Sequence, residues 1–252
     1  MSTGLLLESL RTAVLRAKGD EKSVGVAYSG GIDSSIVAAL AQEIADTRCY
    51  SAVVPGSHDA RTVSASAAEE GRELEVVELS DERLVTLAIE ARDLVGSSDS
   101  TPIAYTIPLV AVIGTARENV VFAGNGADEL FGGYAKYVTT PNPQQEMEVD
   151  LGKSIREAKA LERHALVQGK RIGFPFLSDN VRELARTMPI EQKIQGSSRK
   201  LPLISLAREI GLPSEHRPKK AAQYSSGVLR RMEKLAKADG KSTAAWVASL
   251  SQ

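Results

Sequence analysis

The stretch VGVAYSGGIDSSIVAAL, residues Val24–Leu40, decides the fold because it joins an apolar run, a Ser-Gly-Gly turn and an Ala-rich segment. The apolar run predicts a buried strand that ends at Tyr28, and the Ala-rich segment predicts a helix that begins near Ser34. Two glycines permit a tight turn with exposed backbone, and the N–H groups of the helix start face that turn. These N–H groups, the helix dipole and the serine hydroxyls can all point at phosphate oxygens, so the stretch is typical of an anion-binding turn.

Asp33 stands out in this turn because a carboxylate repels a phosphate unless a cation lies between them. That arrangement predicts Mg²⁺. A purely structural interpretation is a strand-to-helix turn in which Asp33 or Ser34 is the N-cap. A Walker-type phosphate loop is excluded, since no Gly-Lys-Ser/Thr follows the glycines.

The chain on both sides of this stretch alternates short β-rich runs with helical patterns, which predicts an α/β protein with a doubly wound parallel sheet. Strands are expected over Ser23–Tyr28, Tyr50–Val54, Glu75–Leu79 and Asn119–Ala123. Helices are expected over Leu5–Lys18, Ser34–Ala45, Ala60–Glu70, Asp81–Val95 and Ile107–Arg117.

The strand signals stop after about Tyr137, and the rest of the chain is helical with several prolines. We expect one domain over residues 1–252, with an α/β core over 1–137 and a helical C-terminal lobe over 138–252 that covers one end of the sheet. The polar, Pro-rich segment Thr139–Gln145 (TTPNPQQ) is the expected mobile connection.

Composition excludes several classes of protein. The 252 residues carry a formal net charge of -1, so no basic field indicates a nucleic-acid partner. The single cysteine, Cys49, has no thiol to pair with and is expected to be buried, and the three histidines lack ligand spacing. No apolar span of about 18 residues predicts a membrane helix, and a cytoplasmic protein is expected.

The segment SGGIDSS, Ser29–Ser35, resembles the SGGxDS loop of the ATP pyrophosphatases, which cleave ATP to AMP and pyrophosphate while adenylating a substrate. Asparagine synthetases, GMP synthetases, NAD synthetases and tRNA-thiolating enzymes share this loop. The resemblance implies the adenine nucleotide α-hydrolase-like form of the doubly wound fold. It names half of a reaction and leaves the product open.

The segment AGNGADELFGGY, Ala123–Tyr134, narrows the choice, since it resembles the SGxGxDExFGGY segment of the asparagine synthetase and β-lactam synthetase family. Both Asp33 and Asp128 would follow the carboxyl ends of parallel strands, where open sheets bind ligands, so they are placed to share a cation. Weaker matches follow in the family's order at Ser57–Gly71, Gly169–Val181 and Arg199–Gly227. The chain thus resembles the synthetase domain alone, as in short archaeal-type asparagine synthetase-like proteins.

This resemblance implies a reaction in which a substrate carboxylate attacks the α-phosphate of ATP, and ammonia or an amine then displaces AMP to form an amide. It implies ATP and Mg²⁺ as cofactors, with Asp33 and Asp128 as metal ligands and catalytic residues. The family's R-x-K lysine matches Lys219, for which Lys220 is an alternative. Residues expected to bind ATP and pyrophosphate are Ala27, Tyr28, Ser29, Gly30, Gly31, Asp33, Ser34, Ser35, Val54, Ala123 and Gly124. Residues expected at the substrate are Asn125, Glu129, Tyr134 and Arg171.

Three departures from the family pattern concern the nitrogen donor and the substrate. The chain begins Met-Ser-Thr-Gly without an N-terminal Cys nucleophile, so no glutaminase domain is expected and the amine arrives freely or from a separate glutaminase chain. Asn125 replaces the glutamate of asparagine synthetases and cannot accept a proton from the amine. Arg171, Gly173 and Ser178 replace the family's Glu, Arg and Asp around PFL. The carboxylate substrate therefore stays open.

Two other functions stay open beside an amide-forming ligase. One is another adenylating enzyme with the same loop, acting on a tRNA base or a small metabolite. The other is a nucleotide-sensing module that binds ATP or AMP without chemistry. Release of pyrophosphate from ATP separates an enzyme from a sensor. Trp246, in the apolar pattern STAAWVASL, is expected in packing or a subunit contact, which leaves a homodimer open.

Overall fold

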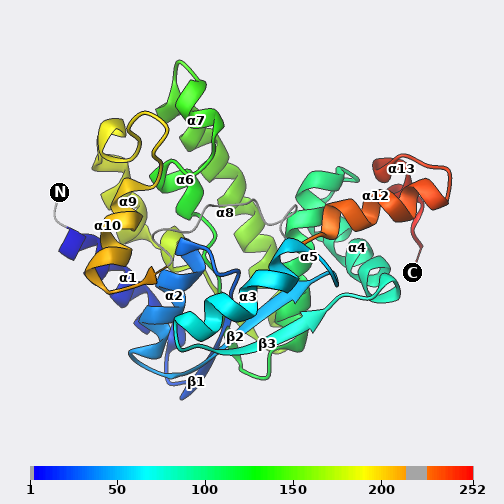
Figure 1. Ribbon diagram of the computed structural model, residues 1–252, viewed down its shortest axis with the longest axis horizontal. Helices are drawn as coiled ribbons and strands as arrows, with labels where there is room; N and C mark the ends of the chain where they lie inside the picture. Colours follow the sequence, from blue (N-terminus) through cyan, green and yellow to red (C-terminus); the bar gives the residue numbers. More distant parts are fainter. Residues whose placement is uncertain (1–2, 214–225, 252) are drawn as a thin grey trace.

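The computed structural model describes residues 3–213 and 226–251, and in it a parallel sheet lies between two sets of helices (Figure 1). All strand pairs are parallel and the strand order is β3-β2-β1-β4-β5. The strands are β1 (Ser23–Ala27), β2 (Asp46–Val53), β3 (Glu73–Glu78), β4 (Val120–Phe122) and β5 (Arg171–Gly173). The predicted doubly wound α/β fold is confirmed.

The strand order reverses between β1 and β4, because the chain winds outward from β1 to β2 and β3 and later returns to β4 and β5 on the other side. Val26 of β1 lies opposite Cys49 of β2 and Phe122 of β4. In open α/β sheets the carboxyl ends of the strands at such a reversal form the crevice in which ligands bind. The turns that follow β1 and β4 therefore meet at the expected ligand site.

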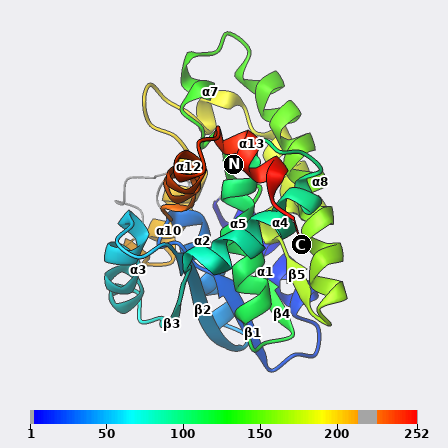
Figure 2. The ribbon, with the colours of Figure 1, turned by 90° about the vertical axis from the view of Figure 1, so that its right-hand side faces the viewer.

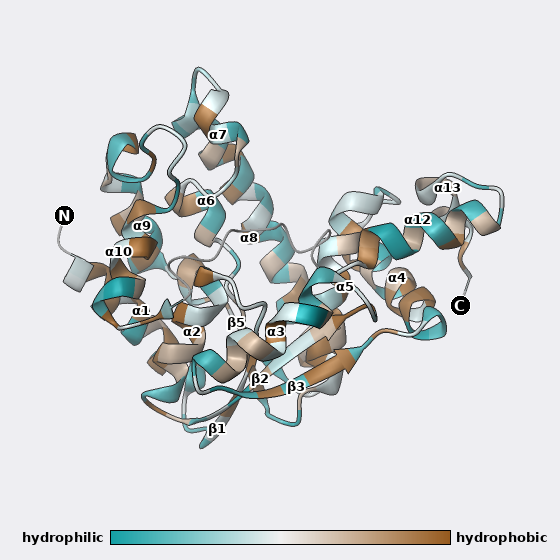
Figure 3. Ribbon diagram, viewed as in Figure 1, coloured by the Kyte–Doolittle hydropathy of each residue, from teal (hydrophilic) through white to brown (hydrophobic). Residues whose placement is uncertain are grey.

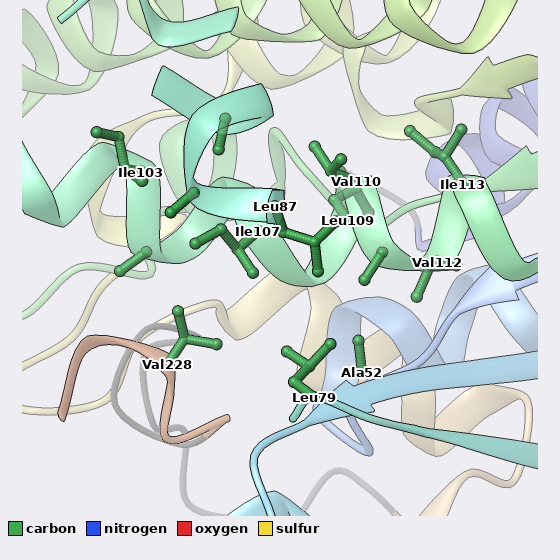
Figure 4. Packing of buried hydrophobic residues seen from close by; sticks show 14 of the residues in the cluster. Ala52, Leu79, Leu87, Ile103, Ile107, Leu109, Val110, Val112, Ile113 and Val228 are labelled. Carbon is green, nitrogen blue, oxygen red and sulfur yellow. The ribbon is translucent and has the colours of Figure 1, made fainter. Parts of the chain in front are cut away.

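Strand side chains alternate between two cores, since successive residues of a strand point to opposite faces of the sheet. Val121 and Ala123 belong to one core, whereas Val120 and Phe122 belong to the other. In the first core, Ile107 and Leu109 lie over Ala52 and Leu79 (Figure 4). The helices of this core are α4 (Asp81–Val95), α5 (Ser100–Thr115), α8 (Pro143–Val167), α12 (Val228–Ala238) and α13 (Thr243–Ser249).

The second core covers the opposite face of the sheet and contains Cys49, whose burial raises the pKa of its thiol to about 12. The expected buried thiol is confirmed. The longer helices of this core are α1 (Thr3–Lys18), α2 (Ile32–Gln42), α3 (His58–Glu69), α9 (Asp179–Thr187) and α10 (Leu201–Glu209). Hydrophobic segments occur both on strands of the sheet and on the surrounding helices, where they alternate with hydrophilic ones (Figure 3).

Shorter elements complete the helical part of the chain. They are α6 (Ala127–Phe131), α7 (Lys136–Thr139) and the 3-10 helices η1 (Pro175–Leu177) and η2 (Ile190–Gln192). Helices α6, α7, α9 and α10 gather on one side of the molecule, and α4, α5, α12 and α13 gather on the other (Figure 1). The long helix α8 contacts α7 at one end and β5 at the other (Figure 2).

Two expectations about the second half of the chain are corrected. The strand signals do not end at Tyr137, because β5 pairs with β4 as a fifth strand; its three residues are too few for a recognisable alternation. The expected connection Thr139–Gln145 is shorter, since Thr139 ends α7 and α8 begins at Pro143. Within residues 3–213 and 226–251, no helix combines the length and hydrophobicity needed to cross a bilayer.

Candidate active site

The turn between β1 and α2 holds its shape through its own serines. Gly30 has a φ of 72°, a left-handed conformation that side chains disfavour. The backbone N–H of Ser29 donates to Ser34 Oγ at 3.1 Å, and Ser34 Oγ donates to the carbonyl of Gly31 at 3.0 Å. Gly31 is the N-cap of α2 and offers no side-chain cap. The N–H of Gly31 donates to Ser29 Oγ at 3.4 Å, and no N-cap side chain occupies the N–H groups of the first helical turn, which can therefore face an anion.

Ser35 differs from the other two serines of this turn. Its side chain is fully buried, and its hydroxyl donates to Glu70 Oε1 at 2.8 Å. Glu70 follows the end of α3, so this hydrogen bond joins α2 to α3. The hydroxyls that remain at the turn are those of Ser29 and Ser34, which lie 3.2 Å apart.

Asp33 and Asp128 lie at the two helix starts that meet at the reversal of the sheet, in the first turns of α2 and α6. The structure places a third residue between them. Lys200 Nζ is 2.6 Å from Asp33 Oδ1 and 2.8 Å from Asp128 Oδ1. Both carboxylates therefore lie close enough together to contact one ammonium group, and their sharing of a metal ion stays a prediction.

Lys200 is positioned at a conformational cost. It is 4% exposed, and burial lowers the pKa of its ammonium while the nearby Asp33 opposes that change. With a φ of 57° it is the one non-glycine residue of the described chain in the left-handed region, which costs on the order of 1 kcal/mol or more. A Cβ at Gly133 would overlap both Asp128 and Lys200, so a glycine is required there.

Lys200 is not among the residues expected at the site from the sequence, although it lies in the matched segment Arg199–Gly227. One signal was present, because Lys200 directly precedes α10 and a cation is unfavourable at the start of a helix. A lysine in that position indicates an anionic partner elsewhere in the fold. Which carboxylates it meets depends on tertiary structure.

The acid pair fits Mg²⁺ in its donor chemistry. Two carboxylates converge at Asp33 and Asp128, and Mg²⁺ is commonly held by one or two carboxylates together with substrate phosphates and water. Over the described ranges no group of three or more His, Cys, Asp or Glu side chains forms a self-sufficient metal cage. The two carboxylates therefore suit a metal that arrives with a nucleotide.

Glu129 and Tyr134 form a second pair beside the first. The hydroxyl of Tyr134 donates to Glu129 Oε1 at 2.6 Å, and burial raises the pKa of the Glu129 carboxyl. The ring of Tyr134 packs on that of Tyr137, with centroids 5.4 Å apart. Asn125 is half-buried in the turn before α6, and no described residue hydrogen-bonds to its side chain.

Residues expected to line the nucleotide lie at the carboxyl ends of three neighbouring strands. Ala27 ends β1 and Tyr28 follows it, and Val54 follows β2, where its N–H donates to the carbonyl of Ser226 at 2.9 Å. Ala123 and Gly124 follow β4, and a Cβ at Gly124 would come within 3.0 Å of Asp33. The fold thus brings this set together beside the turn.

Arg171 is an expected site residue that does not join this cluster. Arg171 begins β5, and its guanidinium donates to the carbonyls of Ala17 and Lys18. The amino end of a parallel strand is the edge opposite the site, so the expected substrate role of Arg171 is corrected. The expected catalytic lysines, Lys219 and Lys220, lie outside the described residues.

Fold and site define a doubly wound α/β protein with an acid and lysine cluster beside a glycine-rich turn at the reversal of its sheet. A family model for asparagine synthase matches residues 5–171, and the chain belongs to the asparagine synthase family. The resemblance drawn from SGGIDSS and AGNGADELFGGY is thereby confirmed.

Individual relatives are similar over most of this chain. A Methanocaldococcus jannaschii protein described as "Putative asparagine synthetase 1 (glutamine-hydrolyzing)" is 29% identical, over 92% of this chain and 51% of its own length. Asparagine synthetase B of Escherichia coli is 23% identical, over 88% of this chain and 44% of its own. The chain spans about half the length of these relatives. A solved structure of NMN synthetase from Francisella tularensis aligns at 11% identity with a TM-score of 0.49, over 98% of this chain and 91% of its own.

Proposed function

We propose that this protein is an ATP-dependent amide-forming ligase, which adenylates a substrate carboxylate and passes the acyl group to ammonia or an amine. The observation that carries the proposal is the convergence of the turn at Ser29–Ser35 with Asp33, Asp128 and Lys200 at one end of the sheet. Family membership supports an ATP-using ligase in general terms. The amide-forming reaction and the substrates are our proposal.

In the first half-reaction the turn binds the phosphates that leave as pyrophosphate. The start of α2 offers backbone N–H groups and the hydroxyls of Ser29 and Ser34. Asp33 and Asp128 would hold Mg²⁺, which when bound supplies charge neutralisation on the phosphates. Lys200 already lies on both carboxylates, so it keeps them together and brings a positive charge to the place where negative charge develops.

In the second half-reaction an amine attacks the acyl carbon and AMP leaves. The amine must lose a proton, which Asn125 cannot accept. Glu129 directly follows Asp128 in the sequence. Its raised pKa makes it a better proton acceptor than an ordinary glutamate. We assign Glu129 that role, with Tyr134 holding its carboxylate in place. The amine is ammonia or an amine-bearing substrate, free in solution or delivered by a separate glutaminase chain.

The proposal is tested by pyrophosphate release from ATP, with a panel of carboxylates and amines in the assay. Asp33→Asn and Asp128→Asn should each lower the rate by roughly a hundredfold or more, because each removes a charge that holds the metal and the phosphates. Asp20→Asn changes an exposed carboxylate at the other end of β1 and should have no effect. Unchanged turnover in both site variants would contradict the proposed roles, and ATP binding without any release would favour a sensor.

A further inference from the structure

A cavity of about 350 Å³ lies between α6, α8 and α9, beside the residue that follows η2. Its volume is within the range of small-molecule sites. Leu130, Met147 and Leu151 give it an apolar wall, and Glu129 and Glu148 lie on its α6 and α8 sides. Lys193 lines it from the segment between η2 and α10.

Lys193 has no evident structural reason to carry a charge in this place. Its side chain is 2% exposed, and no described residue accepts a hydrogen bond or forms an ion pair with its Nζ. Burial lowers the pKa of this ammonium to about 8, with Glu148 opposing from a distance. Burying a cation without a close partner destabilises the fold, and an apolar residue of the same length would avoid this penalty.

The other cations of the cavity already have carboxylate partners, and Glu148 accepts a hydrogen bond from Gln144 at 3.4 Å. Arg186 pairs with Glu183 at 2.8 Å, and Arg182 pairs with Asp179. Glu129 accepts the hydrogen bond of Tyr134, described above. Among the described residues that line the cavity, Lys193 is therefore the cation without a partner.

We propose that this cavity binds a small monocarboxylate with an apolar body. The carboxylate would lie on Lys193 Nζ, and the body would lie against Leu130, Met147 and Leu151. One unpaired cation matches one negative charge, whereas a phosphate dianion would bring excess charge close to Glu148. Leu130, Met147 and Leu151 in the lining favour an aliphatic or aromatic body over a second polar group.

This site differs from the proposed ATP site, although the two are neighbours. Lys193 contacts neither Asp33 nor Asp128, but its carbonyl accepts the N–H of Leu201 at 3.1 Å at the start of α10. Glu129 borders the cavity and also lies close enough to Lys200 for its carboxyl to sense that charge. Occupation of the cavity is measured without ATP, so its test does not depend on the proposed function.

The test measures binding of hexanoate and benzoate to the full chain by calorimetry at pH 7, with hexanamide and benzamide as neutral isosteres and inorganic phosphate as the alternative anion. We expect at least one of the two carboxylates to bind, and the matching amide to bind roughly tenfold to hundredfold more weakly, because a charge-assisted hydrogen bond is lost. Lys193→Met should abolish carboxylate binding. Lys159→Met, which changes an exposed lysine of α8, should leave binding intact.

Several results would overturn the proposal. These are no binding of either carboxylate to the wild type, equal binding of amide and carboxylate, undiminished binding in Lys193→Met, or tighter binding of phosphate than of carboxylate. A circular dichroism spectrum of Lys193→Met that matches the wild type establishes that loss of binding is not loss of fold. Should that variant fail to fold, the comparison of amide with carboxylate in the wild type still decides.

Discussion

Lys200 shows how much of the site depends on one side chain in a costly conformation. Its backbone is left-handed, its ammonium is buried, and it contacts the two carboxylates expected to bind metal. A strained non-glycine residue persists where the surrounding structure specifies it, and such residues cluster at functional sites. We therefore count Lys200, together with Asp33 and Asp128, among the central residues of the candidate site.

Substitution of Glu129 should slow the second half-reaction, amide formation, and spare the first, adenylation. Glu129→Gln keeps the shape of the side chain but removes the proton acceptor, so amide formation should fall by roughly a hundredfold. Pyrophosphate release in the first turnover should persist, because Asp33, Asp128 and Lys200 are untouched. Quench-flow measurement of both products checks this, with Glu162→Gln, an exposed position of α8, as the control. Equal loss of both products would refute a role confined to the amine.

The burial of Lys193 predicts how the stability of the protein depends on pH, in the absence of any ligand. Folding lowers its pKa from about 10.5 to about 8, so the folded protein binds its proton less tightly than the unfolded chain does. Between pH 8 and pH 10.5 the unfolded state binds more protons than the folded state, so the free energy of unfolding of the wild type increases as the pH rises. Lys193→Met should thus be more stable than the wild type at pH 7, by roughly 1–3 kcal/mol, with an advantage that shrinks toward pH 10.

Urea unfolding at both pH values, compared with Lys159→Met, measures this difference. The charged groups around Lys193 are Glu148 on α8, Glu129 on α6, and Asp179, Arg182, Glu183 and Arg186 on α9. They are the same in both proteins, so their own titration largely cancels. If Lys193→Met is not more stable than the wild type at pH 7, or if its added stability grows toward pH 10, burial of the Lys193 ammonium does not destabilise the fold.

Among the elements, the start of α2 combines a proposed phosphate-binding turn with a structural contact. Ser35 joins this first turn to the end of α3 through its hydrogen bond to Glu70. Ser35→Ala should cost about 1–3 kcal/mol of stability, because Glu70 loses a buried donor, and should leave ATP affinity unchanged. Ser34→Ala, which breaks the hydrogen bonds inside the turn, should weaken ATP binding.

Thermal unfolding and ATP titration of these two variants separate the roles. If Ser35→Ala binds ATP more weakly but is as stable as the wild type, the hydroxyl of Ser35 contacts the phosphates, as the sequence alone predicts.

The elements also show what sequence patterns can and cannot reach. Helix α4 spans the predicted Asp81–Val95 because Ser80 caps it and Gly96 ends it, two signals that are local. Helix α5 begins seven residues ahead of the predicted Ile107, since Asp99 caps it and Pro108 is tolerated inside it. Strand β5 was missed because its pairing with β4 comes from distant parts of the chain. Local signals thus predicted most of the fold, and long-range pairing limited the rest.

For the whole molecule, the reversal of the sheet between β1 and β4 makes one site from two distant motifs. SGGIDSS and AGNGADELFGGY lie about a hundred residues apart, yet the parallel pairing of β1 with β4 brings the helices after them to one lysine. The sequence predicted that Asp33 and Asp128 meet, because the carboxyl ends of parallel strands share an edge. It could not predict that Lys200 joins them or that Arg171 lies at the other edge, because both depend on tertiary packing.

The central claim is that a carboxylate oxygen attacks the α-phosphate of ATP at this site, and isotope transfer tests it most directly. A carboxylate that supports turnover is supplied with both oxygens as ¹⁸O, together with ATP, Mg²⁺ and an amine, and the AMP is examined by mass spectrometry. The account predicts equal amounts of AMP and pyrophosphate, with one ¹⁸O in each AMP, because the oxygen that bridges acyl group and phosphate leaves with AMP. Unlabelled AMP, or ADP and phosphate as products, would contradict it.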